Sequence, residues 1–591
     1  MRPSPNLWPN TNGSRGVLFL AQLLSEMLTP TTFESFRVFS LDTNARLREA
    51  LQLADDVRRS RIPQAALKPV IEELEWSFSK DSACRVLAPA ETDSLLSVVN
   101  CKTGLSLDAL RSHLNLLIKL ISPNYKTKLE ELILGKFDDP KQKVEIRKLV
   151  GFYCSHIINL GYSRRYILDV VNRFFFDGRV HRIGRSTLGR FFREFDAKPK
   201  RFIVHASVSD DLSTYLNRHG HQVRQVNQLF HDQQATLSSN ANFANTPQAL
   251  ETIVEHFDPY GAMDHCYQML SAQRAIAYLD PFGMEVEWGG TMHVTRLRAQ
   301  TGIAVTKGDF LDVRRPSKST RSLLRPRSIS NYAKRIQNNF NPSSTERLRS
   351  SIRTAALARS SGSPENQLIS LWSAIEVLLS EPRDQARIVH YASLIAPCIT
   401  LRHTRRQIFA VYDELLIGYG SKFRRLVRSI PSYKTTLEHH AFAEMLLLPE
   451  HEQRRQSLLQ LLTNNPLALH RVFKIYNDYR DTKRASRTIS DHADRVAWQI
   501  HRVYRARNQL VHSGRLPSYL ESIILNLAEY YRSAIATIVD HARREDESSD
   551  IDQVVAEIGI RYGIFRDKFK RAGTTSLTPE HISLLMDIPS M

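Results

Sequence analysis

The 591-residue chain is poor in cysteine. It has five, and no two of them form a Cys-x-x-Cys pair. An odd number of widely separated cysteines indicates neither a disulfide framework nor a structural zinc site. Free thiols suit a reducing compartment, so we expect a cytoplasmic protein. The five are Cys84, Cys101, Cys154, Cys266 and Cys398.

Long apolar runs and familiar catalytic motifs are also missing. No stretch approaches the roughly 18 apolar residues that a membrane-spanning helix needs, so we expect no membrane partner. The chain has no P-loop, no G-x-G-x-x-G, no G-x-S-x-G and no protein-kinase motif set. Metal-ligand residue types gather at residues 264–266, 439–440 and 491–494, but without the spacing of three or four ligands. We therefore expect neither a metal nor a cofactor.

Acidic residues are scarce relative to basic ones. Lysine and arginine number 81 against 61 aspartates and glutamates, which gives a formal charge of +20 and a pI near 9.7. Such a surplus favours a polyanionic partner, and nucleic acid fits better than a membrane because no long basic amphipathic helix stands out. The alternative is that the charge is spread thinly and serves solubility.

The periodicity of apolar residues predicts a mainly α-helical protein with a small central α/β module. Residues 1–199 have the pattern of a helical N-terminal region, and 200–312 that of the α/β module. A basic linker is expected at 313–342, where arginine, proline and serine are frequent. Residues 343–545 fit a helical bundle with a basic helical insertion at 383–490, and 546–591 fit a C-terminal tail.

Within the α/β module, alternating apolar residues predict four strands. They are expected at 202–208, 275–279, 284–288 and 292–297, with a helix at 247–270 that breaks at Asp258-Pro259. Residues 280–283 are expected to form the turn between two of these strands.

The stretch from Tyr504 to Gly514 is the most informative one in the chain. It places Arg507, Asn508 and His512 at the end of a helix whose apolar stripe runs from Val496 to Val511. Asp491 is the expected N-cap of this helix, and Ser513-Gly514 its expected end. The stripe predicts that Arg507 lies on or beside the buried face. A histidine in the last turn is half-exposed and titrates near neutral pH.

This stretch resembles the R-N-x-x-x-H signature of HEPN domains, a helical family that includes bacterial ribonuclease toxins and antiphage effectors. A second segment, from Pro364 to Leu379, resembles the L-x-x-L-W-x-A-I-E-x-L helix of ApeA-like HEPN proteins, and residues 347–353 fit the helix before it. The bundle at 343–545 is therefore identified as HEPN-like. The resemblance implies a metal-independent endoribonuclease, either an antiphage defence protein or a toxin-like effector.

The resemblance also implies roles for individual residues. His512 would transfer protons, Arg507 would stabilise the phosphorane, and Asn508 would orient the histidine or a phosphate. Five residues on a straight helix turn Arg507 and His512 about 140° apart, so the family's arrangement, a homodimer with two helix ends in one cleft, is expected. Glu376 is expected to pair with Arg507 or Arg359. We expect RNA to follow a further set of basic residues: Arg502, Arg505, Arg480, Lys483, Arg484 and Arg487.

Other interpretations stay open. Arg507 can be a structural arginine of the bundle and His512 a surface histidine that the helix dipole favours. The bundle can bind RNA or a nucleotide without cutting it, or the protein can be a basic scaffold for a protein partner. A phage or cellular trigger is expected to act on the N-terminal region, by analogy at the level of the fold.

Overall fold

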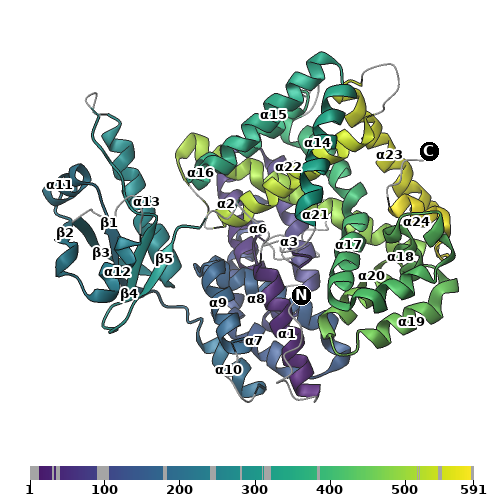
Figure 1. The fold of residues 1–591 in the computed structure, drawn as a ribbon, viewed down its shortest axis with the longest axis horizontal. Coiled ribbons are helices and arrows are strands. Elements are labelled where there is room, and N and C mark those ends of the chain that lie inside the picture. The colour runs from purple at the N-terminus through teal and green to yellow at the C-terminus, as the bar shows by residue number, and fades with distance from the viewer. Residues whose placement is uncertain are drawn as a thin grey trace. The chain divides into compact units, whose positions relative to one another are not determined.

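The computed structural model describes residues 12–29, 32–34, 40–89, 106–177, 183–239, 248–279, 283–308, 311, 321–381, 386–515, 517, 519–542 and 549–586. The chain is mainly helical and contains one small antiparallel sheet, as its sequence predicts (Figure 1). It divides into two compact units. One comprises residues 1–155 with 310–591, and the other comprises residues 156–309. Cys101 and the basic residues at 312–320 lie outside the described residues.

The N-terminal helices of the larger unit pack against its C-terminal helices. Among the pairs in contact, α1 packs against α20 and α3 against α21, although more than 400 residues separate each pair in sequence. The N-terminal helices are α1 (Asn12–Leu28), α2 (Thr43–Arg58), α3 (Lys68–Lys80), α4 (Ser82–Leu87), α6 (Leu107–Ile121), α7 (Tyr125–Lys136) and α8 (Lys143–Leu160).

The C-terminal helices share one continuous apolar core. They are α14 (Arg321–Asn338), α15 (Pro342–Ser360), α16 (Pro364–Leu378), α17 (Arg387–Arg428), α18 (Glu438–Leu447), α19 (Glu452–Leu461), α20 (Pro466–Tyr479), α21 (Thr482–Ser513), α22 (Leu520–His541), α23 (Ile551–Arg571) and α24 (Pro579–Leu585). In two regions these helices differ from the sequence-based expectation. Helix α14 occupies much of the expected linker, and α23 and α24 occupy the expected tail, where Val554, Ile558 and Phe569 are buried in the core.

Helix α21 is longer than the sequence suggested. It begins after Asp481, whose carboxylate accepts a hydrogen bond from the Arg484 backbone N–H at 2.8 Å, so Asp481 is the N-cap and Asp491 is not. The helix ends at Gly514, which adopts a left-handed conformation with φ of 63°, as expected for a glycine after a helix. The buried stripe includes Val496, Ile500 and Val503. These side chains fix which face of α21 meets the core.

Helix α16 carries one of the two segments on which the family resemblance rests. It packs against α15, α21 and α22. Trp372 of α16 is fully buried, and its ring lies 5.5 Å from that of Tyr504 on α21, centroid to centroid. The indole N–H of Trp372 donates a hydrogen bond to Glu376 at 2.8 Å. The two segments that carry the family resemblance are therefore in direct contact.

The smaller unit is built on a five-stranded antiparallel sheet in the order β2-β3-β1-β4-β5. Its strands are β1 (Lys200–Ser207), β2 (Gln222–Gln225), β3 (Gln248–His256), β4 (Thr291–Arg296) and β5 (Ile303–Thr306). The central strand β1 pairs with both β3 and β4. The helices of this unit are α9 (Arg164–Phe175), α10 (Arg185–Arg193), α11 (Asp210–Arg218), α12 (His231–Ser238) and α13 (Pro259–Ala277).

Two segments of this unit have the opposite secondary structure from the prediction: an expected helix begins as a strand, and an expected strand belongs to a helix. Residues 248–256 form a strand, because Leu250 and Val254 satisfy both a helical spacing and an alternating one, and the register with β1 decides between them. Residues 275–277 end α13, and Tyr278 and Leu279 are exposed and have no sheet to join. Asp258 caps α13 through Gly261 N–H at 2.8 Å, so the expected break is the start of the helix. The expected turn falls mostly outside the described residues.

Candidate functional site

The C-terminal end of α21 holds the residues that the family signature singled out. Arg507 is three-quarters buried, and its guanidinium lies 3.7 Å from a carboxylate oxygen of Glu376. The expected pair between Glu376 and Arg507 is thus confirmed. A second guanidinium nitrogen of Arg507 donates to the Asn508 side-chain oxygen at 3.1 Å. The buried Nε of Arg507 finds no hydrogen-bond partner among the described residues.

His512 stands free at the same helix end. Its side chain is exposed, and the described part of the chain offers it no hydrogen bond or ion pair. Its neighbour Ser513 donates back to the Gln509 carbonyl at 2.6 Å, which closes the last turn. Arg507, Asn508 and His512 therefore share the final two turns of one helix, with the arginine held from α16 and the histidine open to solvent.

Two arginines expected on an RNA surface are placed elsewhere. Arg502 is fully buried, with its guanidinium 2.7 Å from Glu49 of α2 and also hydrogen-bonded to Glu73 of α3. Arg505 lies 2.8 Å from Glu49 as well. Because two carboxylates occupy these guanidinium groups inside the protein, Arg502 joins helices, and its predicted exposure to RNA is wrong.

The charges in this cluster overcome the cost of burying them. Burial alone raises the pKa of Glu49, but the positive charges of Arg502 and Arg505 outweigh it and hold that pKa at about 2. Glu73 behaves in the same way: burial raises its pKa, while Arg502 and Arg46 bring it below the ordinary value. Both carboxylates are therefore ionised in the folded protein near neutral pH.

The remaining basic residues expected to contact RNA lie at the opposite end of α21. Arg480, Lys483, Arg484 and Arg487 are grouped around the start of the helix. Twenty-three residues separate Arg484 from Arg507, which corresponds to about 35 Å along the helix axis. The structure thus divides the predicted site into two places: the signature end of α21 and a basic region at its beginning.

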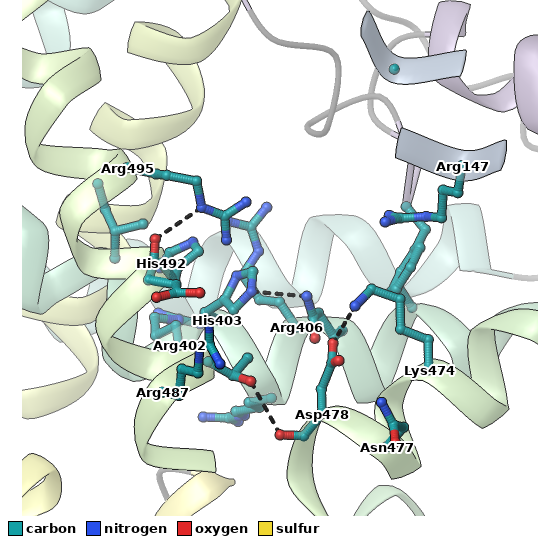
Figure 2. A pocket seen from close by; sticks show the side chains of 18 of the residues that line it. Arg147, Arg402, His403, Arg406, Lys474, Asn477, Asp478, Arg487, His492 and Arg495 are labelled. Atoms are coloured by element: carbon teal, nitrogen blue, oxygen red, sulfur yellow. Dashed lines mark hydrogen bonds and ion pairs between the residues drawn. The ribbon is translucent and has the colours of Figure 1, made fainter. Parts of the chain in front are cut away.

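This basic region is the wall of a large cavity within the larger unit. The cavity has a volume of about 1610 Å³ and is lined mainly by α3, α8, α17, α20, α21 and α22. Fourteen lysine and arginine side chains line it, against five carboxylates. We refer to it as the basic cavity. In Figure 2, Arg402, Arg487 and Arg495 lie around two histidines, and Arg147 and Lys474 stand on the other side.

Several of these cations are already paired. Arg147 donates to Glu34 at 2.7 Å, Lys474 lies 2.5 Å from Asp478, and Arg402 lies 3.0 Å from Asp540. In contrast, Lys483 and Arg487 are exposed to the cavity and have no hydrogen bond or ion pair within the described ranges. They are one helical turn apart, so they present two uncompensated charges side by side.

Two histidines stack inside the basic cavity. The rings of His403 on α17 and His492 on α21 are 3.5 Å apart, centroid to centroid, with 25° between their planes. The Gln407 side-chain nitrogen lies 2.8 Å from His403 Nε2, and the Thr400 hydroxyl lies 3.4 Å from His492 Nδ1. In the sequence, His492 belongs to the group at residues 491–494, which lacks the spacing of a metal site. Nothing local connects it to His403, which lies 89 residues earlier.

The described residues contain no group of three or more histidine, cysteine, aspartate or glutamate side chains placed to hold a metal ion. In the part of the chain that the structure covers, no helix is both long and apolar enough to cross a membrane. No family model matches the chain, and comparison with curated proteins and with solved structures found no match.

Proposed function

We propose that this protein is a metal-independent, HEPN-type endoribonuclease that cleaves RNA at the C-terminal end of α21. One observation supports the proposal most directly. The segments that resemble the family pack together, and Glu376 of α16 approaches Arg507 of α21 at 3.7 Å. This contact leaves Arg507, Asn508 and the exposed His512 together at one helix end, which is the set of side chains that the chemistry needs.

The reaction begins when the ribose 2′-oxygen attacks the adjacent phosphorus. A base removes the 2′-OH proton, the bond from phosphorus to the 5′-oxygen breaks, and an acid protonates the departing 5′-oxygen. The product is a 2′,3′-cyclic phosphate. His512 is the group that transfers protons near neutral pH. Arg507 stabilises the negative charge on phosphorus with two N–H donors, and Asn508, already hydrogen-bonded to Arg507, orients the guanidinium.

A homodimer completes the site in this proposal. On one helix Arg507 and His512 are turned about 140° apart, so a single copy does not direct both at one phosphate. Two α21 ends that meet across a twofold axis would supply an arginine and a histidine from each copy. The exposed side chain of Val511, 49% accessible, gives this end an apolar contact for such a partner.

The N-terminal helices are the proposed place at which a phage or cellular trigger acts. They touch the signature helix through the buried pairs of Arg502 with Glu49 and Glu73. A movement of α2 or α3 would therefore displace Arg502 and shift α21. We propose an antiphage or toxin-like role on this basis, with RNA as the substrate.

A second function, RNA binding without cleavage, is favoured by one feature. Arg507 already has a carboxylate partner in Glu376, as a purely structural arginine would. In that case the same surface binds RNA and His512 has no chemical task.

Incubation of the purified protein with total RNA in EDTA distinguishes the two. We expect fragments that end in 2′,3′-cyclic phosphate. The His512→Ala variant is expected to lose about 10²–10⁴-fold in rate while staying folded. The control is His231→Ala, which removes an exposed histidine of the smaller unit. An excess of His512→Ala protein should also inhibit the wild type through mixed dimers. Binding without cleavage, or full activity of His512→Ala, would refute the nuclease.

A further inference from the structure

The basic cavity concentrates more positive charge than its own carboxylates neutralise. Its fourteen cationic side chains face five carboxylates. Like charges held at close range destabilise one another unless an anion joins them. The pKa of Lys80 reports this field: burial lowers it, and Arg487, Lys148 and Arg495 lower it further, against the opposing charge of Asp491. The cavity is therefore prepared for a negatively charged ligand.

The cations stand on several walls, which suits a ligand that carries more than one phosphate. On α21, Lys483, Arg484 and Arg487 follow the spacing of one helical face, and Arg480 precedes them at the end of α20. Arg402 of α17 and Arg495, farther along α21, line the same space (Figure 2). Arginine pairs with phosphate oxygens through two parallel N–H groups, so a set of arginines around one space can hold a chain of phosphates.

The same cavity offers flat surfaces for a ring. The stacked pair of His403 and His492 lies among the arginines, and Trp76, Phe409 and Tyr530 also contribute to the lining. Aromatic and histidine rings stack on nucleobases, as they do in nucleic-acid complexes. A volume of about 1610 Å³ exceeds the usual 300–1,000 Å³ of a small-molecule site, so a nucleotide and its water fit inside.

We propose that the basic cavity binds a nucleoside polyphosphate. Lys483 and Arg487 hold the phosphates, and the rings hold the base. This site is distinct from the RNA-cleaving end, because Lys483 and Arg487 lie at least 20 residues before Arg507, about 30 Å along α21, and neither Arg507 nor His512 lines the cavity. It does not depend on the proposed nuclease activity. The sequence analysis assigned the four basic residues around the start of α21 to an RNA path. In this proposal they face a smaller ligand.

Calorimetric titration of the full-length His512→Ala protein tests the proposal, because this variant leaves RNA probes intact. The probes are ATP, AMP, inorganic tripolyphosphate and a 20-nucleotide single-stranded RNA, in buffer near physiological salt. We expect ATP to bind most tightly, tripolyphosphate to compete with it, and AMP to bind at least tenfold more weakly. Lys483→Gln with Arg487→Gln should weaken ATP binding at least tenfold.

The matched control removes two charges elsewhere. Lys570→Gln with Arg571→Gln changes exposed residues of α23 that do not line the cavity, and ATP affinity should stay within twofold. Equal losses in both double variants would reduce the effect to net charge and overturn the site. An RNA affinity that falls in the cavity variant, with no competition from tripolyphosphate, would establish an RNA path instead. ATP no tighter than tripolyphosphate would remove the nucleoside from the proposal, and no binding of either would refute it.

Discussion

Arg502 and Arg507 are the same residue type on one helix, yet their surroundings assign them different roles. Arg502 is buried and paired with two carboxylates, whereas Arg507 is a quarter exposed and lies 3.7 Å from its partner Glu376. A partly exposed guanidinium with one distant partner can turn toward a phosphate, whereas a buried guanidinium paired with two carboxylates cannot. The helical periodicity correctly predicted that Arg507 lies beside the buried face. It did not predict the burial of Arg502, because the carboxylates that pair with Arg502 lie more than 400 residues earlier in the chain.

Replacement of Arg507 separates charge from geometry. Arg507→Lys keeps a cation near Glu376 but loses the two-pronged donor, so RNA cleavage should fall about 10²-fold with little change in unfolding temperature. Arg507→Ala should lose as much activity and also about 1 kcal/mol of stability, since Glu376 is left partly buried. The measurements are single-turnover cleavage and thermal unfolding. Arg515→Lys, at an exposed arginine beyond the helix, is the control. Normal cleavage by Arg507→Lys would reject the phosphate contact.

At the scale of the helix, the sequence predicted the end of α21 and missed its beginning. Gly514 is a strong stop signal because a left-handed residue after a helix favours glycine. The first turns carry Lys483, Arg484 and Arg487, which line the basic cavity, and bury only Ala485 and Ile489 as apolar side chains, which is too few for a recognisable stripe. A pattern based on core burial therefore started the helix ten residues late, at Asp491. The same reason explains why the cavity itself was invisible to sequence analysis: its walls come from helices far apart in the chain.

The end of α21 can be weakened without touching a side chain. Gly514→Ala places a β-carbon on a residue with φ of 63°, where nothing lies within 4 Å of that carbon. The cost is therefore one of backbone conformation, about 1–2 kcal/mol. Urea unfolding should show this loss, and Gly514→Asn should show less. Gly135→Ala is the opposite control: an exposed glycine inside α7, where alanine should be neutral or stabilising. Equal stability of Gly514→Ala and wild type would contradict the role of the glycine as a helix stop.

For the larger unit as a whole, buried ion clusters join the two ends of the chain. Arg471 of α20 contacts Glu26 of α1 at 3.1 Å, Glu34 at 3.2 Å and Glu414 of α17 at 2.5 Å. Arg502 plays the same part between α21 and the N-terminal helices α2 and α3. Composition and periodicity identified both regions as helical. They gave no sign that residues 1–155 complete the fold of the C-terminal bundle, because an ion pair between distant segments leaves no local pattern.

This arrangement predicts how the protein responds to acid. The pKa of Glu49 is about 2 in the folded protein against an ordinary value of 4.5, a difference worth on the order of 3 kcal/mol. A lowered pKa contributes stability that is present above about pH 4.5 and is lost as the pH falls toward 2. Glu73 acts with the same sign. The free energy of unfolding, from urea titrations followed by circular dichroism, should therefore fall as the pH is lowered from about 4.5 toward 2.

Removal of the shared arginine should weaken this dependence of stability on pH. Arg502→Met removes the arginine that Glu49 and Glu73 share and leaves each buried carboxylate with one arginine, Arg505 for Glu49 and Arg46 for Glu73, which costs about 3–5 kcal/mol at pH 7. The pKa values of Glu49 and Glu73 then rise, because Arg505 and Arg46 alone oppose the effect of burial less strongly, so protonation relieves part of the cost. The gap in stability between wild type and Arg502→Met should shrink as the pH falls. Arg353→Met, which breaks an exposed pair with Glu346, should cost under about 1 kcal/mol at any pH. A gap for Arg502→Met that stays constant from pH 7 to 3 would show that Glu49 and Glu73 do not depend on this arginine for their charge.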